Sequence, residues 1–330
     1  MKYAKDTRPK GVANKAAEVL VEALPWIKNI TGKTVVIKYG GSAMVDEQLR
    51  ADVMNDIVLL KIVGVNPVIV HGGGKAITEA MEFVNLPVEF KDGQRVTTPE
   101  AMDLVRTVLM GKVNQELVEA LNEHGNFAVG VSGADAGVIV AEQASPELGR
   151  VGRITRINSP LLDDLVAGDY IPVVASVALG EDGGFYNVNA DMVAGHIAAA
   201  IGAHKVVFLT DVDGLYENFE DKSTLISNLT LFEAQYLIEN DVVSTGMIPK
   251  LKSCVTALDA GVFRAHILNG TTPHSLLLEL LTSTGVGTTM HSTEEACKFD
   301  AHPLGNFASK LLENREQAAA QAAAAERFVG

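Results

Sequence analysis

Cysteine is almost absent from this 330-residue chain, in which only Cys254 and Cys297 occur. Two thiols that form no CxxC pair exclude a disulfide framework, so a packed apolar core must hold the fold together. Long hydrophobic runs are also lacking, and none reaches the roughly 18 residues that a membrane-spanning helix needs. The first twenty residues carry five Lys or Arg residues without a continuous apolar stretch, a pattern unlike a secretory signal peptide. We therefore expect a soluble protein of the reducing cytoplasm that binds no membrane.

Positive charge is in deficit as well. The chain has 27 Lys and Arg residues against 41 Asp and Glu residues, which gives a formal net charge of −14. A surface of this sign repels polyphosphate backbones, so a general nucleic-acid binder is excluded. Phosphate binding in one small pocket is not excluded, because local backbone dipoles can outweigh net charge there. At about 150 residues per domain, the length predicts two domains or lobes.

Short β-rich runs alternate with longer helical patterns along most of the chain. The expected strands are 34–39, 67–70, 171–174 and 206–209, and the expected helices include 45–63 and an alanine-rich stretch at 191–201. This alternation predicts an α/β fold, an αβα sandwich with a mostly parallel central sheet and helices on both faces. Glycine-rich breaks follow the strands, where parallel sheets collect their ligands.

The two ends of the chain differ from its middle. Residues 13–30 show helical spacing with Trp26, and Pro25 should kink this extra N-terminal helix. Having no sheet to cover, the helix is expected to act as a lid or as a contact to another subunit. The Ala/Gln/Glu-rich C-terminal end could form a helix, but it lacks large apolar anchors and is expected to be frayed or disordered. Glycines and acids at 178–184 suggest a lobe boundary. The predicted segments are 1–30, 31–179, 180–298 and 299–330.

The first glycine loop, His71-Gly-Gly-Gly-Lys75, lies between an expected strand and an expected helix. Successive backbone N–H groups at a helix N-terminus form an anion cradle. Ile69 and Ala76 stand where a Walker A loop needs Gly and Ser or Thr, and Ile77 breaks the dinucleotide fingerprint. Taken alone, the loop is explained equally well as a tight structural corner.

A second glycine corner, Gly40-Gly41, closes the preceding strand and brings Lys38 with it. Two corners at the ends of adjacent parallel strands should lie side by side, where they could hold a transferring group with three equatorial oxygens. A lysine at the end of an apolar strand is costly to bury unless it meets an anion. The alternative is that its side chain extends to solvent.

Two further segments place polar residues at helix starts. In the run Asn187-Val-Asn189-Ala-Asp191, an N-cap role explains one of the three polar residues and leaves the others open. Lys250 falls in the first turn of a helix expected over 247–260, where the helix dipole disfavours a cation. An anionic partner would explain this lysine, and a solvent-exposed side chain is the alternative.

Together these residues resemble the amino-acid kinase family, with motif order and spacing preserved over about residues 15–290. The resemblance rests on six blocks: KYGGSAM (38–44), HGGGK (71–75), KDGQRVTTPEAMD (91–103), NVNAD (187–191), LTDVDGLY (209–216) and GMIPK (246–250). The blocks at 91–103 and 187–191 are similar to the branch that phosphorylates N-acetyl-L-glutamate, rather than to uridylate, carbamate or aspartate kinases. One departure is Lys75-Ala76, where the family pattern has Pro-Gln.

The resemblance implies ATP-dependent phosphorylation of the side-chain carboxylate of N-acetyl-L-glutamate, a step of arginine biosynthesis. It gives Lys38 and Lys250 the role of stabilising the phosphoryl group in flight, with Asp191 holding both lysines. It further implies N–H donation to that group by Gly41 and Gly73, N-acetylglutamate binding by Gly73, Gly74, Arg95 and Asn187 with Asn189 nearby, and ATP binding by Gly40, Thr210, Asp211, Val212, Gly214 and Tyr216. Mg²⁺ would enter on the nucleotide, because no acidic cage is evident.

The chemistry of such a reaction agrees with this inventory. A carboxylate with a pKa of about 4.3 is already ionised at neutral pH and needs no general base. The repulsion between this carboxylate and the γ-phosphate must be overcome. Each pair of unit charges about 4 Å apart interacts with an energy of about 4 kcal/mol at an effective dielectric of 20. Two lysines and two amide-lined corners suit in-line phosphoryl transfer.

The N-terminal helix with Trp26, together with 273–279 and 285–288, resembles the arginine-inhibited branch, a homo-hexamer built as a trimer of dimers. The resemblance implies an L-arginine site at His274, Glu279 and Gly287, and a regulator of the PII type is a further candidate partner. An ordinary amphipathic core helix would also explain 273–281. Two other functions stay open, namely a kinase for another small carboxylate or carbamate, and a non-catalytic arginine-sensing module.

Overall fold

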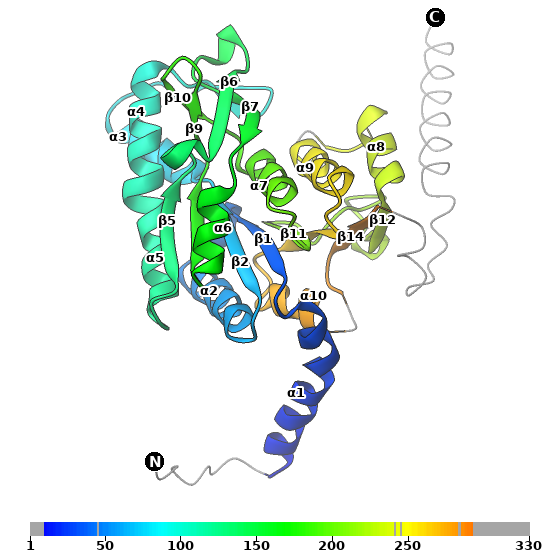
Figure 1. Cartoon of the computed structure of the whole chain (residues 1–330). Coiled ribbons are helices and arrows are strands. Elements are labelled where there is room, and N and C mark those ends of the chain that lie inside the picture. The colour runs from blue at the N-terminus through cyan, green and yellow to red at the C-terminus, as the bar shows by residue number, and fades with distance from the viewer. Residues whose placement is uncertain (1–9, 45, 241, 245, 283–284, 293–330) are drawn as a thin grey trace, which may run out of the picture.

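The computed structural model describes residues 10–44, 46–240, 242–244, 246–282 and 285–292, and its centre is an eight-stranded sheet (Figure 1). In spatial order the strands are β12 (Asn228–Thr230), β14 (Thr288–His291), β13 (Arg264–Asn269), β11 (Lys205–Thr210), β1 (Thr34–Tyr39), β2 (Asn66–His71), β8 (Ile171–Ala175) and β5 (Ala128–Ser132). Every neighbouring pair is parallel except β13 and β14. The four strands expected from the sequence are confirmed, as is the mostly parallel sheet.

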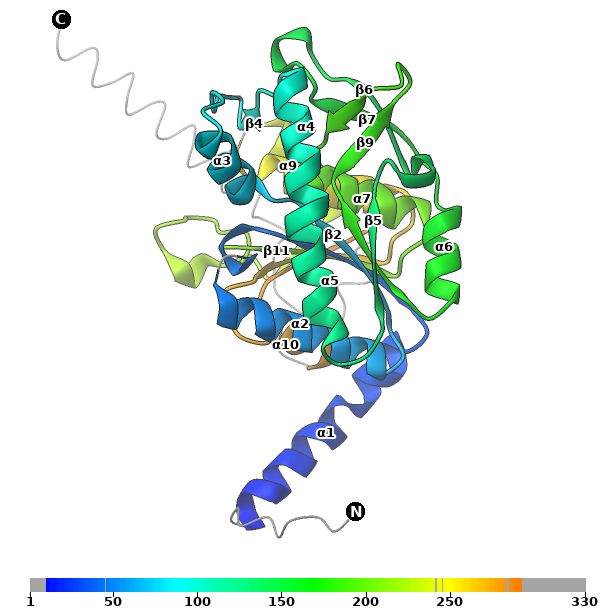
Figure 2. The ribbon, with the colours of Figure 1, turned by 90° about the vertical axis from the view of Figure 1, so that its left-hand side faces the viewer.

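Two apolar cores lie on opposite faces of this sheet, because successive side chains of a strand point to opposite sides. Val35 and Ile37 of β1 join one core, whereas Val36 joins the other. The first core is covered by α2 (Glu47–Ile62), α3 (Gly74–Phe83), α4 (Pro99–Val108), α5 (Gln115–Asn122) and α10 (Ser275–Leu281). The second is covered by α6 (Pro160–Ala167), α7 (Ala190–Ala200), α8 (Leu231–Glu239) and α9 (Ile248–Asp259). The predicted αβα sandwich is therefore confirmed, and Figure 2 shows α4 and α5 running along one side of it.

Smaller elements complete the chain. A four-stranded sheet has the order β10 (Phe185–Asn187), β9 (Val177–Gly180), β6 (Ile139–Gln143), β7 (Gly152–Ile157), and β3 (Phe90–Lys91) pairs with β4 (Gln94–Arg95). Short helical turns lie at η1 (Gly41–Met44), η2 (Leu109–Asn114), η3 (Asp135–Gly137), η4 (Pro146–Leu148) and η5 (Lys222–Thr224), of which η2 is a π-helical turn. The boundary expected at 178–184 covers the end of β9 and the turn that leads into its antiparallel partner β10. The division of the chain into lobes stays a prediction.

The expected N-terminal helix is confirmed as α1 (Lys10–Ile30), which continues through Pro25 and projects from the body (Figures 1 and 2). Its Trp26 and Ile27 pack against the first core. Four of its large apolar side chains stay exposed: Val19, Leu20, Val21 and Leu24. The expectation of a frayed or disordered tail at 299–330 lies outside the described residues, as does Cys297.

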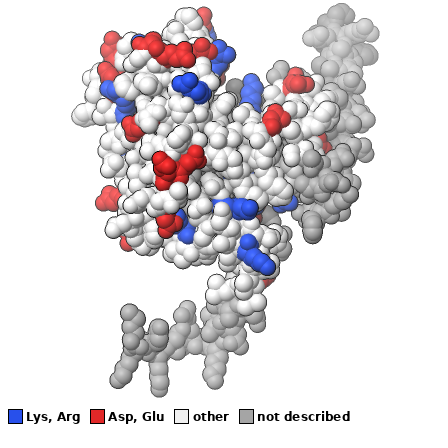
Figure 3. Space-filling view, viewed as in Figure 1, with Lys and Arg blue, Asp and Glu red and all other residues white. Residues whose placement is uncertain are grey.

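In the face drawn in Figure 3, the coloured Lys and Arg side chains of the described residues are scattered and form no continuous basic stripe. A stripe of that kind is typical of nucleic-acid-binding surfaces. Among the described ranges, no helix is long and apolar enough to cross a lipid bilayer.

Helices α7 and α9 approach each other closely at Gly195. A Cβ atom on Gly195 would lie 2.6 Å from the carbonyl oxygen and 2.9 Å from the Cα of Ser253, so only glycine allows this distance between the two backbones. Asp191 lies one turn before Gly195 on α7, and Lys250 lies one turn before Ser253 on α9. The close packing of these helices therefore sets how far apart Asp191 and Lys250 can be.

Replacing Gly195 by Ala should lower the free energy of unfolding by about 1–3 kcal/mol, because the added methyl group must push two backbones apart. Urea denaturation measures this change. Gly111→Ala is the matched control, since Gly111 is exposed within a helical turn and a Cβ there meets nothing within 4 Å. Equal stabilities of the two variants would contradict the tight packing of α7 on α9.

Candidate active site

The glycine corners and Lys38 meet at the carboxyl edge of the central sheet. β1 pairs with β2 on one side and β11 on the other, with Lys38 opposite Val70 and Phe208. The loops that follow these three strands therefore start side by side, as the sequence predicted for the two glycine corners. This arrangement is the usual ligand position of open parallel sheets.

Three charged side chains from distant segments meet at this edge. The Nζ atom of Lys38 lies 3.0 Å from Oδ1 of Asp191, and Nζ of Lys250 donates to Oδ2 of Asp191 over 3.1 Å. The side chains are only 12%, 8% and 15% exposed for Lys38, Asp191 and Lys250. Two ammonium groups share one carboxylate, so the cluster carries one net positive charge in a sparsely hydrated place. Such a charge favours an anionic ligand.

Electrostatics keep Asp191 ionised. Burial raises the pKa of this carboxyl group, but the charges and hydrogen bonds of Lys38 and Lys250 outweigh burial and hold the pKa below its ordinary value. Its two oxygens therefore stay negative and keep the two ammonium groups in place. We call Lys38, Asp191 and Lys250 the lysine–aspartate cluster.

Local sequence signals place two members of the lysine–aspartate cluster, Asp191 and Lys250. Asn189 is the N-cap of α7, and its Oδ1 accepts hydrogen bonds from the N–H groups of Asp191 and Met192 at 2.8 and 3.3 Å. Asp191 thus stands in the first turn of α7, where the helix dipole favours an anion. Pro249 stands just inside the start of α9, a favoured position for proline, and puts Lys250 in its first turn.

The two glycine corners differ in why they need glycine. Gly41 has φ +79°, a left-handed conformation that other residues adopt at a cost, and it opens the turn η1. Gly73 has an extended backbone, but a Cβ atom there would lie 2.7 Å from Leu109 Cδ2. α3 starts at Gly74, so the unpaired N–H groups of its first turn point toward the corner.

A cavity of about 230 Å³ is lined by all five of the expected substrate-binding residues. Its lining includes Lys38, Gly72, Gly73, Gly74, Phe90, Arg95, Asn187, Asn189 and Asp191. Arg95 is only 7% exposed, and its Nη2 donates to Gly74 O and Thr78 Oγ1 at 2.8 and 2.7 Å. Its guanidinium group also lies over the ring of Phe90. The cavity therefore holds a second cation, separate from the lysine–aspartate cluster.

A second cavity, of about 480 Å³, contains most of the expected nucleotide-binding residues. Its lining includes Thr210, Asp211, Val212, Gly214, Tyr216, Phe219, Val242, Val243, Met247 and Lys250. Gly40 lies instead in an adjoining cleft of about 840 Å³ with Lys38 and Gly41. Lys250 lines the second cavity and Asp191 lines the first, so the two cavities meet at the lysine–aspartate cluster.

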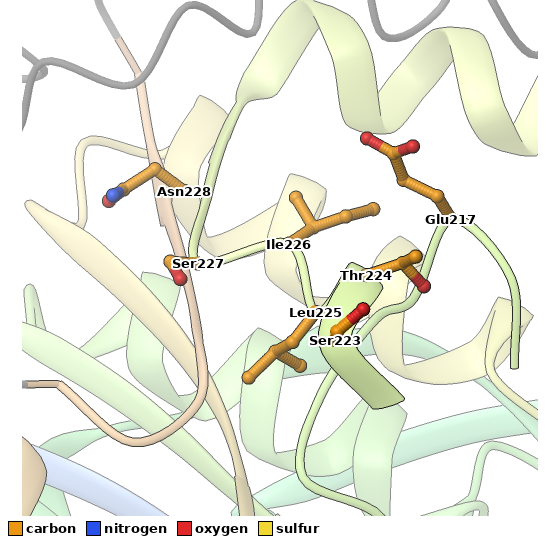
Figure 4. Close-up of a pocket in the computed structure, with 7 residues that line it drawn as sticks. All are labelled: Glu217, Ser223, Thr224, Leu225, Ile226, Ser227 and Asn228. Atoms are coloured by element: carbon orange, nitrogen blue, oxygen red, sulfur yellow. The ribbon is translucent and has the colours of Figure 1, made fainter. Parts of the chain in front are cut away.

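Sequence reasoning missed the apolar wall of this second cavity. Phe219 and Met247 were not assigned to the nucleotide site, although Phe219 is only three residues from Tyr216 and Met247 belongs to the block at 246–250. A small cavity of about 270 Å³ lies next to it and shares Glu217 (Figure 4). The labelled side chains there come from the segment that leads through η5 into β12.

The expected regulatory residues divide into two groups. His274, whose side chain is 53% exposed, contacts the buried Asp56 of α2 over 2.6 Å. Glu279, 3% exposed, accepts hydrogen bonds from Thr289, from the N–H of Val286 and from His266 at 2.8 Å each. Although burial raises it, these hydrogen bonds hold the pKa of Glu279 below its ordinary value. His266 is thus the histidine beside Glu279.

Buried cations accompany Glu279. Burial, assisted by Arg264, lowers the pKa of Lys205 to about 8, and Nε of Arg264 is buried without a hydrogen-bond partner among the described residues. Gly287 is also near Glu279. Tight packing explains why this residue is glycine, because a Cβ atom there would lie 2.2 Å from the carbonyl oxygen of Ile267. Trp26 lies on α1, which contacts α10, the helix that carries Glu279. Lys205 and His266 could have been noted as polar residues inside otherwise apolar strands.

Metal-binding side chains are not clustered in the described ranges, where no group of three or more His, Cys, Asp or Glu residues could hold a metal ion. Cys254 is a buried free thiol.

Comparison with known proteins agrees with this geometry. The sequence profile of the amino acid kinase family matches residues 33–269. The acetylglutamate kinase of Caldanaerobacter subterraneus subsp. tengcongensis is 50% identical over 274 residues, which cover 82% of this chain and 92% of that protein. The acetylglutamate kinase of Halothermothrix orenii is 49% identical over 277 residues, with coverage of 82% and 96%.

A solved structure shares the fold. N-acetylglutamate synthase from Neisseria gonorrhoeae, complexed with coenzyme A and N-acetyl-glutamate, superposes with a TM-score of 0.74 at 24% identity, covering 84% of this chain and 63% of that one. The family resemblance inferred from the six sequence blocks is thus confirmed. This chain belongs to the amino acid kinase family and, within it, to the acetylglutamate kinases.

Proposed function

We propose that this enzyme transfers the γ-phosphoryl group of ATP to the side-chain carboxylate of N-acetyl-L-glutamate, giving N-acetyl-L-glutamyl 5-phosphate and ADP in arginine biosynthesis. The observation that carries the proposal is the position of the lysine–aspartate cluster, where the two cavities meet. One cavity suits the acceptor and the other suits the nucleotide. The reacting groups would then meet at a site of net positive charge.

Charge repulsion is the main barrier that this site must lower. The acceptor carboxylate is ionised at neutral pH, so no proton needs to be removed from it. Its repulsion by a γ-phosphate oxygen costs about 4 kcal/mol per pair of unit charges at about 4 Å and an effective dielectric of 20. Lys38 and Lys250 face this charge from two sides, and Asp191 keeps both ammonium groups in place before substrate arrives. Preorganised cations of this kind lower the barrier to phosphoryl transfer.

Binding of the acceptor is assigned to the first cavity. The guanidinium group of Arg95 would pair with the α-carboxylate, with Asn187 and the Gly73–Gly74 backbone contacting the remaining polar atoms. A buried arginine that lines the same cavity as Lys38 and Asp191 favours an acceptor with a second carboxylate over carbamate. The lysine–aspartate cluster argues against a non-catalytic arginine sensor, because a binding module has no use for it.

The nucleotide is assigned to the second cavity, along Thr210, Asp211, Val212, Gly214 and Tyr216. ATP would bring Mg²⁺ on its phosphates, and the cation would offset part of their negative charge. Asp191 fits a role as lysine partner rather than metal ligand, because each of its oxygens faces an ammonium group at 3.0–3.1 Å.

Regulation by L-arginine is the second part of this proposal. Glu279 offers a buried carboxylate to a guanidinium group, and Lys205 supplies a nearby cation for the ligand's carboxylate. α1 contacts α10 and leaves apolar side chains exposed, which suits packing against a second subunit in a homo-hexamer. Arginine bound beside α10 would then bias the arrangement of the subunits.

An ADP-release assay with N-acetyl-L-glutamate, L-glutamate and L-aspartate in parallel tests the reaction. We expect turnover with N-acetyl-L-glutamate and little with the other two acids. Equal turnover with all three, or none with N-acetyl-L-glutamate, would contradict the proposed function.

Replacing Lys250 by Gln should lower kcat by about 10²–10³-fold, the usual cost of removing one group that stabilises transition-state charge. The KM for N-acetyl-L-glutamate should change little, because Lys250 lines the nucleotide cavity. Steady-state kinetics measure both. Lys252→Gln, two residues further along the same helix and exposed, is the matched control and should keep wild-type kinetics. A Lys250→Gln enzyme with wild-type kcat would refute the role of this lysine.

Replacing Arg95 by Lys should raise the KM for N-acetyl-L-glutamate by about 10–100-fold and leave the KM for ATP unchanged, because a lysine cannot make the bidentate contact. Steady-state kinetics measure both KM values. Lys91→Gln, an exposed site in the same β3–β4 hairpin, serves as control. If Arg95→Lys bound the acceptor normally, another residue would have to hold the α-carboxylate.

Replacing Glu279 by Gln should raise the arginine concentration for half-inhibition by about tenfold or more, because a charged partner of the guanidinium group is lost. Inhibition curves measure this concentration.

Deleting residues 1–28 should leave kinase activity but abolish both arginine inhibition and the hexamer. Arginine inhibition curves and size-exclusion chromatography with light scattering measure the two losses. An undiminished arginine response in the truncated enzyme would contradict the role of α1.

A further inference from the structure

His71 is a fully buried histidine at the end of β2, directly before the glycine corner, and the proposed chemistry does not use it. Its Nδ1 lies 2.9 Å from the carbonyl oxygen of Gly72, and its Nε2 lies 2.9 Å from Nδ2 of Asn114. Burial lowers the pKa of His71 to about 4, so the ring is neutral at physiological pH. A neutral imidazole carries its proton on one nitrogen only, and the proton's position determines what the ring can do.

Asn114 fixes the position of that proton. Its Nδ2 also donates to the carbonyl oxygen of Val173 over 2.8 Å, and this oxygen can only accept. The amide must therefore turn its NH₂ group toward Val173, which directs the second N–H of the same group at Nε2 of His71. Nε2 then accepts, so the proton resides on Nδ1 and is donated to Gly72 O.

The hydrogen bond to Gly72 orients the next N–H. The described residues contain no cis peptide bond, and in a planar trans peptide the C=O and the N–H point in opposite directions. Because the Gly72 carbonyl is held toward the buried ring of His71, the N–H of Gly73 points to the other side. Gly72 and Gly73 line both the substrate cavity and the adjoining cleft with Lys38.

The π-helical turn η2 holds the same loop from another direction. Leu109 and Val113 would lie 2.7 and 3.2 Å from a Cβ on Gly73, and Asn114, the last residue of η2, reaches His71 beneath the loop. π-helical turns are rare in proteins, and those that occur are often found at functional sites. Oδ1 of Asn114 is buried with no hydrogen-bond partner among the described residues, and Gly130 leaves room for it. The turn η2 thus places Leu109, Val113 and Asn114 against the loop that carries Gly73.

We infer that His71 and Asn114 form a positioning pair that locks the Gly72–Gly73 peptide with the Gly73 N–H directed at the reacting groups. The inference rests on the proposed kinase function and deepens it, because it assigns a role to two residues beneath the site that touch no substrate. Without the pair, the peptide could rotate and present its carbonyl oxygen to an anion.

Two replacements of His71 test the pair by moving the donor. In Asn the amide nitrogen is two bonds from Cβ, as Nδ1 is in histidine, whereas in Gln it is three bonds away, as Nε2 is. His71→Asn keeps a donor for Gly72 O and should retain kcat/KM for N-acetyl-L-glutamate within about fivefold. His71→Gln loses that donor and should lower kcat/KM by about 100-fold, the scale for one oxyanion-type N–H. The KM for ATP should stay unchanged in both.

Asn114→Asp provides a second variant. Its carboxylate would accept a hydrogen bond from an Nε2–H group, so the neutral ring would carry its proton on Nε2 and Nδ1 would face Gly72 O without a proton. We expect a loss in kcat/KM like that of His71→Gln, and little further loss when the two changes are combined, since they break one unit. A fully additive double variant would overturn the pair.

His291→Gln is the matched control, because His291 is a buried histidine of the same sheet whose Nε2 contacts an asparagine, Asn228, at 3.1 Å. It should lower the melting temperature and keep kcat/KM. Melting temperatures of all variants separate loss of fold from loss of orientation. Equal kcat/KM for His71→Asn and His71→Gln would refute the inference, whereas a wild-type enzyme that does not phosphorylate N-acetyl-L-glutamate would refute the proposed function itself.

Discussion

A single carboxylate shared by two ammonium groups organises this enzyme. Lys38 enters from β1, Lys250 from α9, and Asp191 stands between them at the start of α7. Without Asp191 the lysines would repel each other in a place with little water, and without the lysines Asp191 would be a buried unpaired charge. Holding all three requires the close contact of α7 with α9 at Gly195 and the pairing of β1 with β11. The central layers of the fold therefore serve to keep three charges together.

The loop opposite the lysine–aspartate cluster depends on neutral groups instead. Its N–H groups carry partial charges whose value for catalysis lies in their direction, and direction is set by crowding and by hydrogen bonds beneath the loop. Leu109 and Val113 crowd Gly73, while His71 and Asn114 hold the peptide before it. Cations and oriented dipoles thus face the same small volume from two sides.

The sequence predicted those features that short-range patterns encode. The runs of β-branched residues predicted the strands β1, β2, β8 and β11, and the run 187–191 predicted an N-cap, which the structure identifies as Asn189. Two glycine corners were predicted to meet because consecutive parallel strands pair. That Asp191 binds both lysines came only from the family resemblance, because no local pattern reports which helix packs on which.

Other features escaped prediction for the same reason. His274 and Glu279 are close in sequence and were assigned to one site, but His274 lies outward against Asp56 while Glu279 is turned inward to His266. The π-helical turn at 109–114 has no sequence pattern, so nothing in the sequence singled out Asn114. The available signal was the presence of polar residues at the ends of apolar strands, such as His71 and Lys205, or within them, such as His266.

The most direct test of the central claim is a crystal structure of the enzyme with ADP, Mg²⁺, aluminium fluoride and N-acetyl-L-glutamate, in which the fluoride complex mimics the transferring phosphoryl group. The account predicts that Nζ of Lys38 and of Lys250 both lie within about 3 Å of the fluoride complex while still contacting Asp191. A complex in which either ammonium group points away from the fluoride, or in which Asp191 has released one of them to ligate the metal, would contradict it.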